Sequence, residues 1–250
     1  MKSHLHSTHL KNKRALRRPA APSNCHLLVF AKAPIPGMVK TRLIPSLGAQ
    51  GAARLYESMA LHCLAAAVNS RVGPVDLWCT PSTGHPFFKR CAEDFHVFLH
   101  PQTQGDIGSR MAHAFQVTLK ISASALLLGT DCPSVTQDDL VAAAAVLQRG
   151  TDAVIVPTED GGYSLLGLRR YTPDLFTGIA WGSESVLEQT RTRLSGLAWS
   201  WHELPERWDV DRPEDVERLK SEGYLLSEIE EWGVREMGGG HSTGGEEMGK

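Results

Sequence analysis

Three basic residues, Lys32, Lys40 and Arg42, follow the apolar segment 26–31 within a short loop. Prolines and Gly37 in the same loop favour a turn. Open α/β sheets bind phosphorylated ligands at such a place, just beyond the carboxyl end of a parallel strand. The loop lacks the glycine patterns of dinucleotide-binding proteins and of P-loops, so Lys and Arg side chains would have to hold the phosphates. A solvated basic loop without a ligand is the alternative.

A second chemical signal is Asp131, which comes two residues after the end of the apolar segment 125–129. This position places the carboxylate at the same edge of the predicted sheet as the basic loop. Carboxylate and phosphate oxygens are the ligands that Mg²⁺ and Mn²⁺ prefer, so Asp131 is a candidate metal ligand. The alternative is that Asp131 only caps the turn or the helix that follows.

Two further acids, Glu159 and Asp160, precede Gly161 and Gly162 between two apolar segments. The glycines allow unusual backbone angles and the close approach of a ligand. We therefore predict that this turn faces the reacting centre, with Asp160 as general base or acceptor-orienting residue and Glu159 as the second candidate. A further metal ligand at Asp160 and an ordinary β-turn remain the alternatives.

Asp209 and Asp211 lie on either side of Val210, so in an extended segment both carboxylates project to the same side. Two acids at this spacing can form a metal motif. They can also mark the entry of a helix, and for Asp215 we favour that capping role.

The segment 102–111 places Asp106 between two glycines just before a predicted helix, with Arg110 in its first turn. A helix N-terminus can bind an anion or a sugar hydroxyl, and Arg110 would add positive charge. We include Asp106 and Arg110 among the candidate nucleotide-binding residues, together with Lys32, Gly37, Lys40 and Arg42.

Apolar runs and helical periodicity alternate along the chain, which predicts βαβ units. Short apolar runs such as 125–128 are typical of strands buried on both faces. The pattern therefore predicts one α/β domain over 25–224, a three-layer fold with a mostly parallel mixed sheet. The predicted strands are 26–31, 75–80, 96–100, 125–129, 153–157, 164–168 and 199–204, and the predicted helices are 51–68, 86–91, 108–120, 136–148, 183–194 and 213–222.

The charge is unevenly distributed. The 250 residues have a net charge of −2, but six bases and no acid lie in residues 1–24, which leaves 20 basic and 28 acidic residues elsewhere. An acidic body argues against a broad nucleic-acid surface and suits a protein that binds a divalent cation with its anionic ligand. We expect residues 1–24 to form a disordered basic arm, with a transit peptide or a nucleic-acid tail as alternatives, and residues 225–250 to form an extension with a flexible Gly-rich tail.

Five cysteines without a CxxC pair argue against a disulfide framework or a zinc site. No apolar segment approaches the length of a membrane span, and no secretory signal is present, so we expect a cytoplasmic protein. Its oligomeric state stays open.

Six ordered segments together resemble a bacterial family of glycosyltransferase-A-type proteins that is often described as arsenosugar-biosynthesis-type. The segments are KAPIPGMVKTRL, GDIGSRM, GTDCP, EDGGYSLLGL, IAWGSESVL and DVDRPEDV, and they span residues 26–220. The resemblance implies a nucleotide-diphospho-sugar transferase fold, related to the guanylyltransferases for molybdenum cofactor and 2-phospho-lactate. It also implies a divalent metal between protein acids and nucleotide phosphates, with Asp131 and Asp211 as ligands. The sequence departs from the family at Thr103-Gln104, where glycine is more usual, and at Ser183, where Thr is usual.

The resemblance favours a metal-dependent glycosyltransferase that uses a nucleotide-sugar donor and a small-molecule acceptor. In such an enzyme, the metal and the basic side chains stabilise the departing diphosphate while a base activates the acceptor. One alternative is a nucleotidyltransferase that joins an NTP to a small anionic acceptor and releases pyrophosphate. Another is a nucleotide-binding protein without catalysis. The sequence leaves the base, the sugar, the acceptor and the anomeric outcome open.

Overall fold

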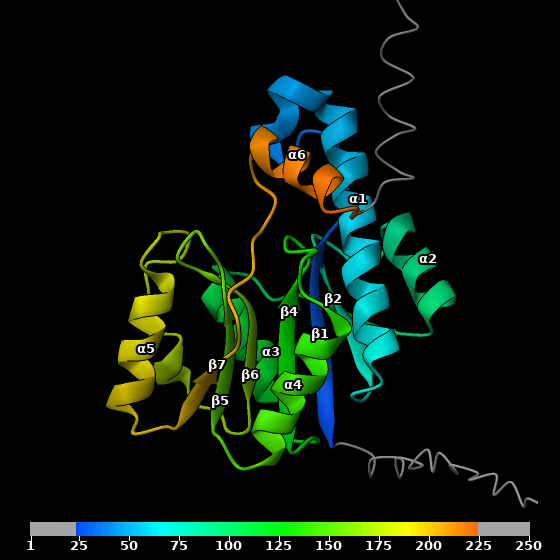
Figure 1. Cartoon of the computed structure of the whole chain (residues 1–250). Helices are drawn as coiled ribbons and strands as arrows, with labels where there is room; N and C mark the ends of the chain where they lie inside the picture. Colours follow the sequence, from blue (N-terminus) through cyan, green and yellow to red (C-terminus); the bar gives the residue numbers. More distant parts are fainter. Residues whose placement is uncertain (1–23, 225–250) are drawn as a thin grey trace, which may run out of the picture.

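The computed structural model describes residues 24–224 and shows a three-layer α/β domain, with helices on both faces of one sheet (Figure 1). The sheet has seven strands in the order β3-β2-β1-β4-β6-β5-β7. The strands of the described part are β1 (Cys25–Lys32), β2 (Val75–Thr80), β3 (Phe98–Pro101), β4 (Ser124–Gly129), β5 (Ala153–Pro157), β6 (Tyr163–Leu168) and β7 (Trp201–Glu203). Its α-helices are α1 (Ile44–Ser70), α2 (Pro86–Phe95), α3 (Ile107–Thr118), α4 (Gln137–Gln148), α5 (Val186–Gly196) and α6 (Pro213–Ser221).

The sheet is mixed and mostly parallel, as predicted. β1 pairs in parallel with both β2 and β4, and the pairs β2–β3 and β5–β7 are also parallel. β6 runs antiparallel to both of its neighbours, β4 and β5. The short turn between β5 and β6 reverses the chain directly, whereas each parallel connection needs a longer crossover. The predicted turn at Gly161-Gly162 is this reversal.

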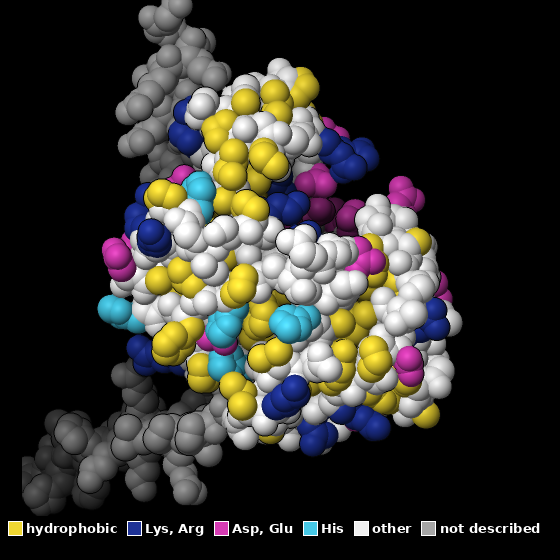
Figure 2. All heavy atoms as spheres, turned by 180° about the vertical axis from the view of Figure 1, so that it is seen from behind, with side chains coloured by type: hydrophobic (Ala, Val, Ile, Leu, Met, Phe, Trp, Pro, Cys, Tyr) yellow, Lys and Arg dark blue, Asp and Glu magenta, His cyan; other side chains and the backbone are white. Residues whose placement is uncertain are grey.

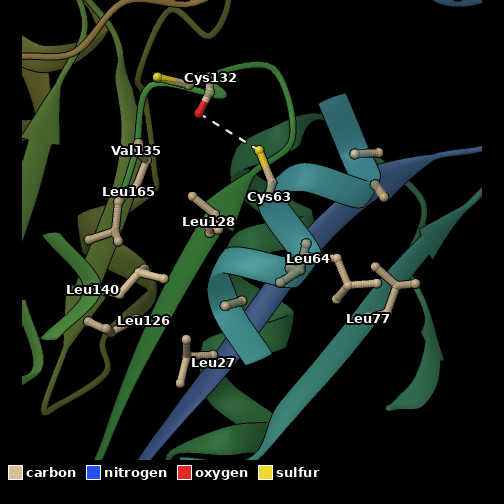
Figure 3. Packing of buried hydrophobic residues seen from close by; sticks show 14 of the residues in the cluster. Leu27, Cys63, Leu64, Leu77, Leu126, Leu128, Cys132, Val135, Leu140 and Leu165 are labelled. Carbon is tan, nitrogen blue, oxygen red and sulfur yellow. Dashed lines mark hydrogen bonds between the residues drawn. The ribbon is translucent and has the colours of Figure 1, made fainter. Parts of the chain in front are cut away.

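Each face of the sheet has its own hydrophobic core. Because side chains alternate along a strand, Leu27 and Val29 of β1 face α1, α2 and α4, whereas Leu28 and Phe30 face α3 and α5. Figure 3 shows Leu27, Leu126 and Leu128 of the first core packed around α1. Strands buried on both faces explain the continuously apolar runs in the sequence.

A third, smaller core joins the start of α1 to the C-terminal part of the domain. Leu43 and Leu55 pack there against Trp208 and Val210. The contact places α6 beside the N-terminal half of α1, as Figure 1 shows. Both the basic loop before α1 and the acidic segment before α6 are thereby held near the same edge of the sheet.

Three predicted element boundaries were wrong by three or more residues. The second helix ends at Phe95 rather than at 91. The first helix begins at Ile44 rather than near Gly51, after a 3₁₀ turn (η1, Thr41–Leu43), and it is interrupted at Gly48, whose φ is 68°. The fifth helix begins at Val186 rather than at 183, because Ser183 and Ser185 are engaged with each other in a turn. The predicted caps are confirmed: Thr136 caps α4, and Asp215 accepts hydrogen bonds from the N–H groups of Asp211 and Arg212.

All five cysteines are free and buried within the described residues, and Cys63 donates to the carbonyl of Cys132 across the first core (Figure 3). None of the helices in residues 24–224 combines the length and apolar character needed to cross a membrane. The predicted basic arm, apart from Asn24, and the predicted C-terminal extension at 225–250 lie outside the described residues.

Candidate functional site

A large open cleft of about 1860 Å³ lies at the carboxyl edge of the sheet. Its volume exceeds that of most single-ligand pockets, so two substrates could fit side by side. In Figure 2, acidic and basic side chains gather where the surface is hollowed beneath the uppermost part of the molecule. Nine of the ten predicted site residues line this cleft: Lys32, Lys40, Arg42, Asp106, Arg110, Asp131, Glu159, Asp160 and Asp211. The tenth, Gly37, has a φ of 84° in the turn of the basic loop but does not line the cleft.

The ammonium of Lys40 lies between the two predicted metal ligands. Its Nζ contacts Oδ1 of Asp131 and lies 3.1 Å from Oδ1 of Asp211. Arg42 adds a second contact, with Nη1 3.0 Å from Oδ2 of Asp211. Residues 169 and 171 positions apart in the sequence thus form one charged network that lines the cleft.

The charges in this network stabilise one another. Burial alone would lower the pKa of Lys40, but Asp131 and then Asp211 raise it above its ordinary value. Partial desolvation by the surrounding protein would raise the pKa of Asp131, but Lys40 and Lys32 hold this pKa below its usual range. Both groups are therefore charged at neutral pH.

Backbone contacts hold the two acids at this spacing. The N–H of Val210 donates to the carbonyl of Asp131 at 3.0 Å, which ties the segment before α6 to the end of β4. Ser134, in the turn after Asp131, donates from its hydroxyl to the carbonyl of Trp208 at 2.9 Å. The positions of the two carboxylates thus depend on the fold of both segments rather than on Lys40 alone.

A bidentate ion pair anchors the same segment to α4. Nε and Nη2 of Arg207 donate to the two carboxylate oxygens of Asp139 at 2.9 and 2.6 Å. Asp139 also accepts from the backbone N–H and the hydroxyl of Thr136. Its side chain is only 8% exposed, so its charge depends on these partners.

We expect Arg207→Met to reduce the free energy of unfolding by about 2 kcal/mol at pH 7, because it leaves the Asp139 carboxylate buried without its cation. Burial would raise the pKa of Asp139, but the hydrogen bonds and charge of Arg207 help to hold this pKa below its ordinary value. Its stabilising effect is therefore present above the unfolded-state pKa and is lost as pH falls through the folded-state pKa. Urea unfolding should show a smaller difference at pH 3, below the ordinary pKa of an aspartate, than at pH 7. An equal loss in the exposed control Arg149→Met would contradict this account.

The turn between β5 and β6 presents Asp160 to the cleft. Oδ1 of Asp160 accepts from the hydroxyl of Thr158 at 2.6 Å and from the N–H of Gly162 at 3.0 Å. Within residues 24–224, Oδ2 of Asp160 has no protein hydrogen bond. The carboxylate is thus held in one orientation with an oxygen left for a ligand.

Glu159 points to a different partner. Both of its carboxylate oxygens lie 3.0 Å from Nη1 of Arg218 on α6. The Arg218 guanidinium in turn stacks over the Trp208 ring, 4.4 Å from its centroid. Glu159 lines the cleft, but its ion pair makes it less available than Asp160 as a base.

Asp209 also lines the cleft, although it is not among the site residues predicted from the sequence. Burial, together with the nearby charges of Asp160 and Asp211, raises its pKa to about 6. The position of Asp209 two residues before Asp211 is the sequence feature that could have identified it. That Asp160 lies close enough to Asp209 to raise its pKa depends on the fold and could not be predicted from the sequence. Asp209 links the predicted metal ligands electrostatically to the predicted base.

The opposite side of the cleft contains the predicted nucleotide contacts near α3. Asp106 caps this helix by accepting from the Ser109 N–H at 2.7 Å, and this bond lowers its pKa. Arg110 folds back, and its Nε donates to the carbonyl of Gly105 at 3.0 Å. Gln102 donates to the carbonyls of Ala31 and Trp78 and so fixes the loop against the ends of β1 and β2.

The segment around Trp181 forms a wall of the cleft that the sequence analysis did not assign. A Cβ at Gly108 would overlap the Trp181 indole, and one at Gly161 would overlap the carbonyl of Glu184. The wall therefore packs against both the start of α3 and the β5–β6 turn. The Trp-Gly-Ser run is the sequence feature that marks this segment. Its contacts with Gly108 and Gly161 depend on packing between distant loops, so the sequence alone does not predict them.

The donor set of the cleft suits Mg²⁺ or Mn²⁺ only in part. No group of three or more His, Cys, Asp or Glu side chains in residues 24–224 is arranged to hold a metal ion by itself. Asp131 and Asp211 do direct oxygens towards one shared cation. Mg²⁺ is commonly bound by one or two carboxylates, with phosphate and water oxygens completing the shell. The two acids therefore fit an ion that enters together with phosphates.

Comparisons with known proteins agree with this architecture. Residues 63–183 match a family described as "Uncharacterized protein conserved in bacteria (DUF2064)". No curated protein matches the chain. A solved structure from Desulfovibrio desulfuricans G20, provisionally named a nucleotide-diphospho-sugar transferase, is 31% identical with a TM-score of 0.69. The match covers 76% of this chain and 83% of that one.

More distant structures share the fold alone. CMP:2-keto-3-deoxy-manno-octonic acid synthetase, solved with CTP, is 10% identical with a TM-score of 0.52, and the match covers 82% of this chain and 99% of that one. A cytidylyltransferase from Leptospira borgpetersenii serovar Hardjo-bovis is 15% identical with a TM-score of 0.51, and the match covers 86% and 95%. The sequence identity and coverage of the Desulfovibrio protein, together with the shared fold, show that the chain belongs to the nucleotide-diphospho-sugar transferase superfamily.

Proposed function

We propose that the protein is a metal-dependent transferase that takes a nucleotide-sugar donor and transfers the sugar to a small-molecule acceptor. The observation that carries the proposal is the network in which Lys40 and Arg42 face Asp131 and Asp211 in one cleft. It combines cationic groups for a diphosphate with carboxylates for a divalent cation. Superfamily membership supports a nucleotide-activated substrate. The narrower resemblance to arsenosugar-biosynthesis-type enzymes stays a prediction.

In this proposal the two sides of the cleft have different tasks. Lys32, Lys40 and Arg42 bind the donor phosphates, with Gly37 shaping their loop and Asp106 and Arg110 at the nucleotide side. Asp131 and Asp211 would hold Mg²⁺ or Mn²⁺, which when bound neutralises charge on the leaving diphosphate. Asp160 orients the acceptor hydroxyl and takes its proton.

The charge on the acceptor side favours glycosyl transfer over nucleotidyl transfer. Within the described chain, Asp160, Asp209 and Glu184 line the cleft without an ion-pair partner. An anionic acceptor, as a nucleotidyltransferase of the predicted kind would need, would be repelled by these carboxylates. A neutral hydroxyl-bearing acceptor would not be repelled, so it suits this side better.

The products test the proposal directly. The protein would be incubated with Mn²⁺, panels of nucleotide sugars or NTPs, and mixed neutral and anionic acceptors, and the nucleotides separated by chromatography. Acceptor-dependent release of nucleoside diphosphate from a nucleotide sugar is the expected result. Release of pyrophosphate from an NTP would establish nucleotidyl transfer instead. Nucleotide binding without either product would indicate a non-catalytic binding protein.

We expect Arg42→Ala to weaken nucleotide binding by about 1–3 kcal/mol, the usual range for a hydrogen bond to a charged group. Calorimetric titration with a nucleoside diphosphate in Mn²⁺ would measure the loss. Arg71→Ala, which removes a base outside the cleft, is the matched control. Wild-type affinity in a folded Arg42→Ala protein would remove Arg42 from the phosphate site.

A further inference from the structure

Lys40 occupies the position that a cation shared by Asp131 and Asp211 would take. Its side chain is only 3% exposed, whereas the two carboxylates are 55% and 41% exposed to the cleft. The ammonium is therefore enclosed by protein, and the acids remain open to an incoming ligand. Arg42 engages the other oxygen of Asp211, so both oxygens of that carboxylate already face a cation.

The backbone at Lys40 is also in an unfavourable conformation. Its φ and ψ are both 45°, in the left-handed region that residues with a Cβ rarely adopt. Such a conformation persists where the surroundings enforce it. The two ion pairs of Lys40 supply part of that enforcement, and both end if the ammonium leaves.

A divalent cation and the ammonium compete for the same atoms. The contacts of Lys40 are made by Oδ1 of Asp131 and Oδ1 of Asp211. A metal ion bound by these two oxygens would lie next to the Lys40 ammonium. The ammonium could then no longer contact both carboxylates. Like charges at that separation repel strongly, particularly where protein limits the access of water.

We infer that Lys40 is a displaceable counter-ion that holds the two acids in place until a divalent cation enters with the nucleotide. The inference rests on the proposed function, because it takes Asp131 and Asp211 as metal ligands. On displacement the ammonium moves from the carboxylates to phosphate oxygens, which are then its nearest anions. Lys40 is in this sense a positioning residue: it makes metal binding weak without nucleotide and strong with it.

The test measures Mn²⁺ binding without nucleotide, by the electron paramagnetic resonance signal of free Mn²⁺. We expect Lys40→Met, which keeps an unbranched side chain one atom shorter and removes its charge, to bind Mn²⁺ about tenfold or more tightly than wild type. Adding a nucleoside diphosphate should raise the Mn²⁺ affinity of wild type by a larger factor than that of Lys40→Met. A merely structural lysine would not produce this difference between the two factors.

Controls separate the possible outcomes. Lys40→Arg keeps the charge and should bind Mn²⁺ alone no more tightly than wild type. Adding Asp131→Asn to Lys40→Met should abolish the gain. If Lys40→Met does not fold, Lys40→Gln, whose amide can still donate to a carboxylate, takes its place.

Equal or weaker Mn²⁺ binding by the folded neutral variant would overturn the inference. The proposed function fails in a different way, namely if wild type gains no Mn²⁺ affinity from any nucleotide or nucleotide sugar. Even after that result, comparing Mn²⁺ binding by wild type and Lys40→Met in the absence of nucleotide would still support or reject the counter-ion role of Lys40.

Discussion

Asp131→Asn is expected to remove most of the gain in nucleotide affinity that a divalent cation provides, a loss of about 10- to 100-fold. The amide keeps the shape of the side chain but loses the charge that attracts the metal ion. Asp211→Asn should have a similar effect, because the two carboxylates share one cation position. Calorimetric titrations with a nucleoside diphosphate, with Mn²⁺ and with EDTA, would measure the gain for each protein.

Affinity without metal provides the internal comparison. Each Asn variant also removes an anion beside Lys40, so binding in EDTA should change little or become slightly tighter. Asp94→Asn, an exposed acid on α2 outside the cleft, is the matched control and should behave as wild type. If both site variants keep the full metal-dependent gain, the two acids are structural partners of Lys40 and not metal ligands.

Asp160→Asn is expected to lower kcat by about 100-fold or more while nucleotide affinity stays nearly unchanged, once a donor and an acceptor are known. The hydrogen bonds from Thr158 and Gly162 reach one oxygen of Asp160 and would hold the Asn side chain in the same place. A lower kcat would therefore result from the loss of the basic carboxylate and not from a displaced side chain. Steady-state rates across a range of acceptor concentrations would separate kcat from KM.

The neighbouring Glu159 sharpens this test. Glu159→Gln should reduce kcat much less, because Glu159 already pairs with Arg218. A large loss in Glu159→Gln with none in Asp160→Asn would exchange the two roles. Loss of metal-dependent nucleotide binding in Asp160→Asn would instead move Asp160 into the metal site, and unchanged turnover would leave an ordinary turn.

Much of the fold could be predicted because its local signals are strong. Continuously apolar runs such as 125–128 become strands covered on both faces, and Thr136 and Asp215 cap helices as their positions indicated. The carboxyl edge of the sheet also follows from the order of strands and loops, which is why nine predicted site residues meet in one cleft. The strands and caps depend on residues close together in the sequence, and the shared edge follows from the alternation of strands and helices along the chain.

The partners of the charged residues could not be predicted in the same way. The sequence indicated that Lys40 would bind phosphates, but its contacts in the structure are two acids, one of them 171 positions away. Likewise, only packing shows that Trp181 lies over Gly108 or that Asp160 raises the pKa of Asp209. Such contacts depend on how distant loops meet, and no local pattern encodes them.

We propose above that one cleft binds a nucleoside diphosphate or nucleotide sugar together with a divalent cation. Calorimetric titration of the wild-type protein with nucleoside diphosphates and nucleotide sugars, in Mn²⁺ and then in EDTA, tests it most directly. We expect saturable binding of at least one nucleotide, with an affinity about tenfold or more higher in Mn²⁺ than in EDTA. Equal affinity in Mn²⁺ and EDTA, or no binding by any member of the panel, would contradict it.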